Sequence, residues 1–483
     1  MASKTQAQQS EPPSAPGVRP QPLWSFRPRS DRDAGDAVVA NFILHWFPAK
    51  IFKPSLDWSY SFWLGTASAA LFLLLILSGL PLMFLYIPSV ERAYQSVKDI
   101  EFVISFGSWI RAVHRISAHL MVIAVALHLV RVFLTGAYKN AAGRLRDASA
   151  SAEAPADRRS LGEGWSASPA EAQRAEAGNN QRREWNWVIG VVMLLLTLFL
   201  SFTGYLLPWD QLAFWAVTVG TNIASSVPWV GPTIRELLIG GRAIEQATLI
   251  RFYVLHIIVL PGLLGGLFAY HMWRVRKDGG LAVSDHEAVG AKTETPVVPT
   301  KTYTLLGVAR GTSPFVRAST TEASDLTVNA IPDLTRRTAI VVLGAIAIVS
   351  ILSVFIASPL EEPANPLVTP NPAKAPWYFL WLQEVVTDTT IKLGSFTING
   401  AFIGGVVLPG LLLTLLTLWP WIDKSPLAAA GRWLPSARRT QNLVFLVILA
   451  IVLVFTVIGL YLRGPYWNFY WPWEAWPDIP GRI

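Results

Sequence analysis

The chain has 483 residues, a mean hydropathy of +0.39 and only 15% charged residues, whereas soluble domains carry about 25%, so the composition argues against a soluble protein. The absence of cysteine excludes disulfides, thiolate metal sites, iron–sulfur clusters and covalently attached c-type haem on this polypeptide. The formal net charge of +8 comes with no nucleic-acid-binding motif, so we expect no nucleic-acid partner.

The N-terminal stretch 1–40 is rich in Pro, Ser, Gln and Arg, so we expect a disordered tail without a cleavable signal peptide. The segment 41–58 mixes Trp and Phe with Lys, which is typical of an interfacial amphipathic segment. Seven apolar stretches are long enough to cross a bilayer; they cover 61–86, 109–135, 187–208, 252–274, 338–358, 400–421 and 441–462. The sequence therefore predicts an all-α membrane protein with seven transmembrane helices, a four-helix bundle followed by three C-terminal helices.

The loops divide the chain and set its orientation. Residues 141–183 are a run of Ala, Ser, Glu, Arg and Gly that cannot bury much apolar surface, so we expect a disordered insertion within a first domain at 41–280. A linker at 281–335 leads to a second domain at 336–483. Most of the 40 Lys and Arg lie in the N-terminal segment and in alternate loops. The positive-inside rule places these in the cytoplasm, with the N-terminus inside and the C-terminus outside.

The second span carries His114, His119 and His128, and ionisable groups inside a bilayer are costly and usually functional. His114 and His128 are 14 residues apart, about 40° short of four full turns and about 21 Å along the helix axis, so both imidazoles face one way. His119 is rotated by about 140° from His114, and we assign it to an inter-helix hydrogen bond.

The fourth span repeats this pattern with His256 and His271, which are 15 residues apart. One span separates the second from the fourth, so the two run parallel. We therefore expect His114 to pair with His256 near the outer face and His128 to pair with His271 near the inner face. Two bis-histidine sites across the membrane are typical of two haems that carry electrons. Zinc fits less well, because it prefers tetrahedral clusters.

Glycines and arginines accompany these histidines. Gly65 and Gly79 in the first span are 14 residues apart, as are Gly190 and Gly204 in the third. Glycine permits close approach of a bulky ligand or of a neighbouring helix, and the shared spacing favours two macrocycles. Four arginines stand near the paired histidines, where haem propionates would supply the anion that a buried guanidinium needs; they are Arg111, Arg115 and Arg251 on the outer side and Arg131 on the inner side. Headgroup snorkelling is the alternative for Arg111.

Four motifs resemble one known family. The stretch GSWIRAVHRISAHLMVIAVALHLVRVFLTGAYK at 107–139 is similar to the helix B signature of cytochrome b and b6. FTGYLLPWDQLAFWAVTVGT at 202–221 and RFYVLHIIVLP at 251–261 resemble that family's quinol-site and fourth-helix motifs. PANPLVTP at 363–370 and PWYFLW at 376–381 resemble its second half. The 15-residue histidine spacing is similar to the b6 type, and seven spans equal b6 plus subunit IV in one polypeptide.

The resemblance implies a subunit of a quinol–cytochrome c reductase with two b haems as cofactors and quinol as substrate. Quinol would be oxidised on the outer side and quinone reduced on the inner side, with proton translocation. It also implies a Rieske iron–sulfur partner, a c-type cytochrome partner and a homodimeric complex in the bacterial cytoplasmic membrane.

Two departures from the family are important. The b6 cysteine that tethers an extra haem is replaced by Trp63, so we expect no covalently bound third haem. The motif Pro-Glu-Trp-Tyr is replaced by Ala375, Pro376, Trp377 and Tyr378, which removes the carboxylate expected to accept a quinol proton. We expect Trp377 and Tyr378 to line the site, and Glu384, seven residues from Trp377, to take over the proton. A plain interfacial acid is the alternative for Glu384.

Two other functions are compatible with parts of the pattern. A haem-b anchor of a dehydrogenase or hydrogenase also binds two haems, but such anchors lack the 202–221 and 363–381 motifs. A transporter or channel would use the buried charges as an ion path, and it would show no haem absorption.

Overall fold

The protein is described by a computed structural model over residues 50–139, 183–278, 280–282, 327–394, 396–426 and 429–477. The expectations for the 1–40 tail, for 141–182 of the insertion and for most of the 281–335 linker lie outside these residues.

Seven helices of the described residues are long and apolar enough to cross a membrane. The first three are α3 (Leu64–Leu85), α5 (Gly107–Thr135) and α8 (Arg183–Leu206). The fourth joins α11 (Gln246–Val254), a π turn η4 (Leu255–Val259) and α12 (Leu260–Lys277). The fifth span joins η5 (Ala330–Leu334) to α15 (Thr335–Phe355). The sixth joins α17 (Gly400–Phe402), η7 (Ile403–Val407) and α18 (Leu408–Ile422). The seventh joins η9 (Ser436–Arg438), α19 (Arg439–Val457) and η10 (Ile458–Leu462). The prediction of a multi-pass all-α membrane protein is confirmed, with boundaries shifted by a few residues.

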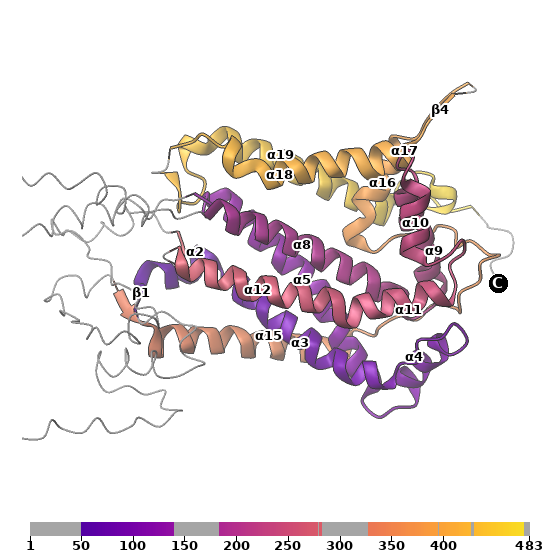
Figure 1. The fold of residues 1–483 in the computed structure, drawn as a ribbon, viewed down its shortest axis with the longest axis horizontal. Helices are drawn as coiled ribbons and strands as arrows, with labels where there is room; N and C mark the ends of the chain where they lie inside the picture. Colours follow the sequence, from indigo (N-terminus) through magenta and orange to yellow (C-terminus); the bar gives the residue numbers. More distant parts are fainter. Residues whose placement is uncertain are drawn as a thin grey trace, which may run out of the picture.

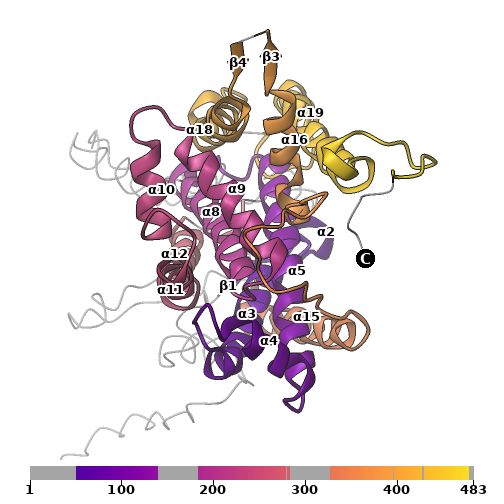
Figure 2. The ribbon, with the colours of Figure 1, turned by 90° about the vertical axis from the view of Figure 1, so that its right-hand side faces the viewer.

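The first four spans form the predicted bundle, in which α3 packs on α5, α8 packs on α12, and α5 contacts α8. The three C-terminal spans do not form a separate layer. α15 packs against α3 and α5, whereas α18 contacts α8, so these spans flank the bundle on different sides (Figures 1 and 2). A buried cluster at mid-height, including Leu71, Val113 and Leu264, joins α3, α5, α12 and α15.

Short elements that connect or follow the spans lie at one end of the bundle (Figure 1). They are α4 (Ala93–Phe102), α9 (Gln211–Ser225), α10 (Gly231–Ile239), the 3-10 turn η6 (Trp377–Phe379), α16 (Leu380–Asp388), the hairpin of β3 (Ile391–Leu393) and β4 (Phe396–Ile398), and η11 (Pro465–Trp467). We call this the outer end, following the charge pattern of the loops.

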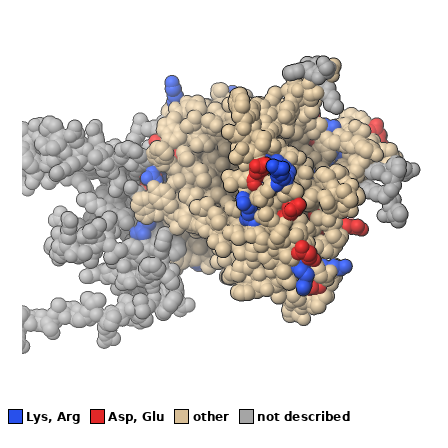
Figure 3. All heavy atoms as spheres, turned by 45° about the vertical axis from the view of Figure 1, so that its right-hand side comes forward, with Lys and Arg blue, Asp and Glu red and all other residues tan. Residues whose placement is uncertain are grey.

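The opposite, inner end carries η2 (Lys53–Leu56), α2 (Trp58–Ser61) and a two-stranded antiparallel sheet. In this sheet β1 (Lys50–Phe52) pairs with β2 (Thr327–Asn329), so that Lys50 lies opposite Asn329. In Figure 3 an uncharged band separates the Lys and Arg at the left of the described surface from the charged side chains that gather in its centre and right, as expected for a surface that contacts lipid.

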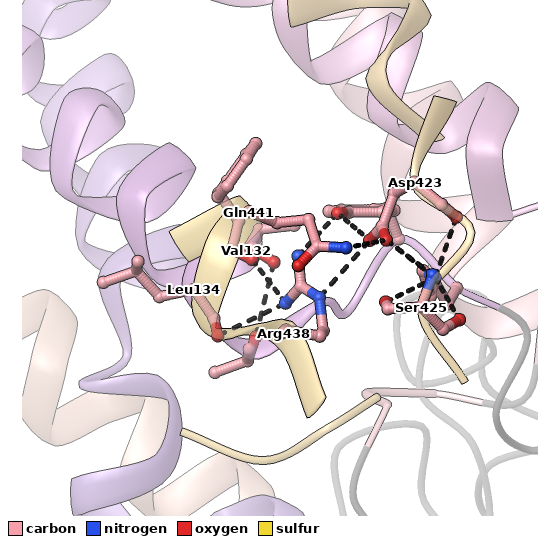
Figure 4. Close-up of polar contacts among 10 residues, drawn as sticks. Val132, Leu134, Asp423, Ser425, Arg438 and Gln441 are labelled. Atoms are coloured by element: carbon pink, nitrogen blue, oxygen red, sulfur yellow. Dashed lines mark hydrogen bonds and ion pairs between the residues drawn. The ribbon is translucent and has the colours of Figure 1, made fainter. Parts of the chain in front are cut away.

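A buried ionic cluster at the inner end ties α5 to the last two spans (Figure 4). Arg438 is fully buried and donates to the carbonyl of Phe133 at 2.8 Å, near the end of α5, where helical carbonyls lack partners. Its Nε lies 3.3 Å from Asp423, which also accepts from Tyr138 at 2.7 Å and pairs with Lys139 at 3.2 Å. The cluster therefore closes the end of α5 and holds the α18–α19 loop.

Candidate functional site

Four histidines form two pairs between α5 and the fourth span. The ring centroids of His114 and His256 are 6.1 Å apart and the rings cross at 70°. His128 and His271 lie close enough that a charge on one imidazole would act on the other. These are the partners that the spacing predicts. A bond between a first-row metal and an imidazole nitrogen is about 2 Å long, so the outer separation leaves room for one metal ion between the rings.

A glycine of a neighbouring span lies against each of these imidazoles. In every case the imidazole Cε1 atom is the nearest neighbour that a Cβ on the glycine would meet. The distances are 2.5 Å for Gly204 and His256, 3.2 Å for Gly79 and His114, 3.3 Å for Gly65 and His128, and 4.0 Å for Gly190 and His271. The glycines of α3 thus support the histidines of α5, and those of α8 support the histidines of the fourth span. The glycines of α3 thus have the same 14-residue spacing as His114 and His128, whereas His256 and His271 are 15 residues apart against glycines that are 14 apart.

Hydrogen bonds set the tautomer of the outer pair. His256 Nδ1 is 3.1 Å from the carbonyl oxygen of Leu200, which can only accept, so Nδ1 carries the hydrogen. His114 Nδ1 is 3.0 Å from Ser78 Oγ, whose own hydrogen goes to the Leu74 carbonyl at 2.6 Å. Ser78 therefore accepts from His114. In both rings the lone pair remains on Nε2, as a metal ligand requires.

The π turn η4 accounts for the extra residue between the fourth-span histidines. It covers Leu255–Val259 and so includes His256. It ends two residues before Pro261, whose ring lacks an N–H and crowds the carbonyl four residues earlier, which widens the helix. A π turn takes about one residue more than an α turn. The 15 residues between His256 and His271 therefore cover nearly the same helical advance as the 14 residues between His114 and His128.

The three outer arginines have protein partners. Arg111 pairs with Glu101 at 2.7 Å and donates to the carbonyl of Ser358 at 2.7 Å. Arg115 lies 3.4 Å from the carbonyl of Pro359, and Arg251 donates to the carbonyl of Leu237. Each of these guanidiniums therefore has at least one protein acceptor, and its contact with a haem propionate stays a prediction.

Arg131, near the inner pair, differs from the outer arginines. Its side chain is only 3% exposed and its guanidinium stacks over the Tyr60 ring at 4.4 Å. Its Nε is 3.4 Å from the Tyr60 carbonyl, but its Nη2 is buried without a hydrogen-bond partner among the described residues. A buried N–H of this kind favours an anion that is not part of the described chain.

A second cluster lies at the outer end, where η6 meets α5. The Trp377 indole donates to His119 Nδ1 at 3.1 Å, which is the inter-helix hydrogen bond expected for this histidine. The Tyr378 ring packs against the same imidazole at 6.2 Å. Burial raises the pKa of Tyr378 to about 12, although a hydrogen bond with Ser201 and the charge of Arg115 act in the opposite direction. The phenol is therefore protonated at neutral pH.

The loop that leads to this cluster is attached to the start of α9. Gln211 N donates to the carbonyl of Glu362 at 2.8 Å, and Asp210 forms an isolated antiparallel β-bridge with Pro363. Asp210 also caps α9 by accepting from Ala213 N at 2.9 Å. The quinol-site motif at 202–221 and the second-half motif at 363–370 are therefore neighbours in space.

Glu384 lies elsewhere. It is 1% exposed, and both carboxylate oxygens accept from Arg463 at 2.8–3.1 Å. Trp377 contacts α5, whereas Glu384 contacts the end of the last span, so the two do not share the neighbourhood that a common helix face predicts. The 3-10 turn η6 before α16 changes the helical phase between them. A proton could reach Glu384 only after this ion pair opened, and sequence analysis had not identified Arg463 as its partner.

Trp63 occupies the position where the resemblance places a cysteine in b6. Its side chain is 6% exposed and packs against Trp58 with ring centroids 5.5 Å apart. Within the described ranges no three His, Cys, Asp or Glu side chains come together as a metal site. The candidate ligands are therefore the two histidine pairs rather than a tetrahedral cluster.

Models of the cytochrome b and b6 family match most of the chain. Residues 51–145 match the family described as Cytochrome b/b6/petB, residues 177–365 match Cytochrome b(N-terminal)/b6/petB, and residues 363–470 match Cytochrome b(C-terminal)/b6/petD. The chain is 36% identical over 216 residues to cytochrome b6 of Synechococcus elongatus, covering 45% of this chain and 81% of that protein. It is also 36% identical, with the same coverage, to cytochrome b6 of Stigeoclonium helveticum. A solved structure titled "Hyperthermophilic respiratory Complex III" shares the fold, with a TM-score of 0.57 and 24% identity over 83% of this chain and 84% of that chain.

Proposed function

The chain belongs to the cytochrome b/b6 family, and from this premise we propose that it is the di-haem, quinol-oxidising subunit of a cytochrome bc-type complex. The observation that carries the proposal is the pairing of four histidines between two parallel spans. Each histidine is supported by a glycine of α3 or α8.

The residues present fit two b haems. The outer haem would be held by His114 and His256, and the inner haem by His128 and His271. Nε2 of both outer rings is free to bind iron, because Nδ1 is engaged by Ser78 or by Leu200. Arg131 has a buried N–H without a partner among the described residues, and this N–H suits an inner propionate. When bound, the two haems supply one-electron transfer across the membrane.

Residues at the outer end of the bundle would position the quinol. We place it at the outer end, between α9 and the η6–α16 segment, where Trp377 and Tyr378 line the space. Tyr378 is a hydrogen-bond donor at neutral pH and its half-buried ring packs against His119, so it can orient a quinol oxygen. Glu384 and Arg463 fix α16 against the last span and thereby hold this wall in place.

The proposal includes partners and an orientation. One electron would leave to a Rieske iron–sulfur protein and from there to a c-type cytochrome, and the other would cross to a quinone at the inner end, with proton translocation. The complex would be a homodimer in a bacterial cytoplasmic membrane, with the N-terminus of this chain in the cytoplasm and its C-terminus outside. Because the chain has no cysteine, it carries no covalently attached haem.

The test is to purify the complex that contains this chain in detergent. We expect two haem b per chain, quinol-dependent reduction of a c-type cytochrome, and loss of one haem in His114→Ala. A chain without haem b, or a haem-bearing complex that does not oxidise quinol, would contradict the proposal.

A further inference from the structure

The environment of His119 points to a role in quinol chemistry, and the inference rests on the proposed function. We propose that His119 of α5 is the base that accepts a proton from the quinol during its oxidation. This position in α5 is five residues after His114 and faces Trp377 and Tyr378 rather than the paired histidines. The imidazole is half-buried, so a molecule lying against Trp377 and Tyr378 can reach it.

The hydrogen bonds of the ring indicate that it is held as a base. Trp377 Nε1 can only donate, and it lies 3.1 Å from His119 Nδ1. Arg115 Nε can also only donate, and it lies 3.4 Å from His119 Nε2. A neutral imidazole has one lone pair and one N–H, so it can accept from only one of these neighbours. Both donors favour the neutral imidazole over the imidazolium, and a quinol hydroxyl can compete with them for the lone pair of the ring.

The other titratable groups near this cluster are poorly suited to accept a proton. In the described part of the chain, the charge of Arg115 from the same helix acts on the imidazole, and the ring of Tyr378 from η6 packs against it. Arg115 is a cation and Tyr378 is a protonated phenol, so neither can accept the proton. Tyr205 and Asp210 act on Arg115, and Asp210 already accepts from two backbone amides. Glu384 uses both oxygens on Arg463. His119 is therefore the available base next to Trp377.

Oxidation of one quinol releases two protons and two electrons. The O–H bond of one quinol hydroxyl breaks and an N–H bond forms on His119 Nδ1, while Trp377 gives up its hydrogen bond to that nitrogen. The second hydroxyl releases its proton to water. The two electrons leave the quinol, which becomes quinone, to the two one-electron acceptors of the proposed function: an iron–sulfur centre of a partner subunit and the outer haem. Protonation of His119 thus also frees Trp377, which couples the proton to the loop that encloses the quinol.

The experiment compares His119→Gln, His119→Glu and Glu384→Gln in the purified complex, by quinol:cytochrome c reductase rate from pH 5 to pH 9. His119→Gln keeps an acceptor for Trp377 but removes the base. We expect its rate to fall about 100-fold, the lower end for general base catalysis, with loss of the decline in rate at acid pH and with both haems retained. His119→Glu restores a base of lower pKa, so the rate recovers and its decline moves to lower pH.

Each outcome decides the matter. A wild-type complex that does not oxidise quinol overturns the proposed function and this inference together. Wild-type rate and pH profile in His119→Gln overturn this inference alone. If His119→Gln loses its haems, the His119→Glu profile decides: an acid decline at the wild-type pH overturns the inference. Glu384→Gln is expected to keep the acid decline; its loss there would assign the proton to Glu384 instead.

Discussion

The contact between Gly204 and His256 gives the sharpest prediction. A Cβ at residue 204 would stand 2.5 Å from Cε1 of His256 and 3.0 Å from each ring nitrogen. Ordinary contact begins near 3.4 Å, so in Gly204→Ala the imidazole must move by about 0.9 Å, the difference between these distances. That shift disturbs its hydrogen bonds to Leu200 and Thr203, which are 3.1 and 3.3 Å long. Overpacking of this kind costs about 1–3 kcal/mol, and displacement of a ligand's supporting contacts lowers metal affinity about 10- to 100-fold.

The matched control is Gly190→Ala, in which the added Cβ lies 4.0 Å from Cε1 of His271. We expect Gly204→Ala to lose the outer haem and to keep the inner one, and Gly190→Ala to keep both. Haem per chain and an optical redox titration measure this, because the titration resolves two transitions in wild type and one in Gly204→Ala. Two haems in Gly204→Ala would refute the reasoning. Loss of the inner haem in Gly190→Ala would show that these glycines contact the macrocycle rather than the imidazole.

Three further predictions concern the inner end. Arg438→Gln should lower the free energy of unfolding by about 1–3 kcal/mol, because Asp423 loses one of its two buried cations while Lys139 remains; thermal unfolding in detergent measures this, and an unchanged midpoint would contradict it. Burial raises the pKa of Asp423, but hydrogen bonds from Tyr138 and Ser425 and the charge of Lys139 outweigh it and hold the pKa at about 2, below the ordinary value of 3.8. Because the folded pKa is depressed, the stabilisation is full above about pH 4 and is lost as pH falls through about 2, so the stability difference between wild type and Asp423→Asn should shrink over that interval; a constant difference would sink this assignment. Arg131→Gln should lower the reduction potential of the inner haem alone, because it removes a buried positive charge; an equal shift of both haems in a redox titration would argue against its placement.

Much of the fold could be predicted from sequence because membrane spans leave a strong local signal. All seven spans were predicted within a few residues, since apolar length and charged ends determine them. The placement of α15 on the opposite side of the bundle from α18 could not be predicted, because lipid-facing and helix-facing sides of these spans are equally apolar.

The functional site was also only partly predictable from the sequence. The histidine pairing could be predicted from residue spacing because helical periodicity determines which side chains share a face. The π turn at Leu255–Val259 was not predicted, although Pro261 is a local signal that could have indicated it. The contact of His119 with Trp377 and the ion pair of Glu384 with Arg463 join residues 258 and 79 positions apart. No local pattern reports such contacts, so the role expected for Glu384 was argued from a helix face that η6 does not continue.

Low-temperature EPR of the oxidised, purified complex tests the central claim most directly. The proposed arrangement predicts two distinct low-spin ferric signals of bis-imidazole type for each chain. His114→Ala or His256→Ala should remove one and the same signal, and His128→Ala or His271→Ala should remove the other. A single signal, or loss of different signals in His114→Ala and His256→Ala, would contradict the pairing of these helices through two haems.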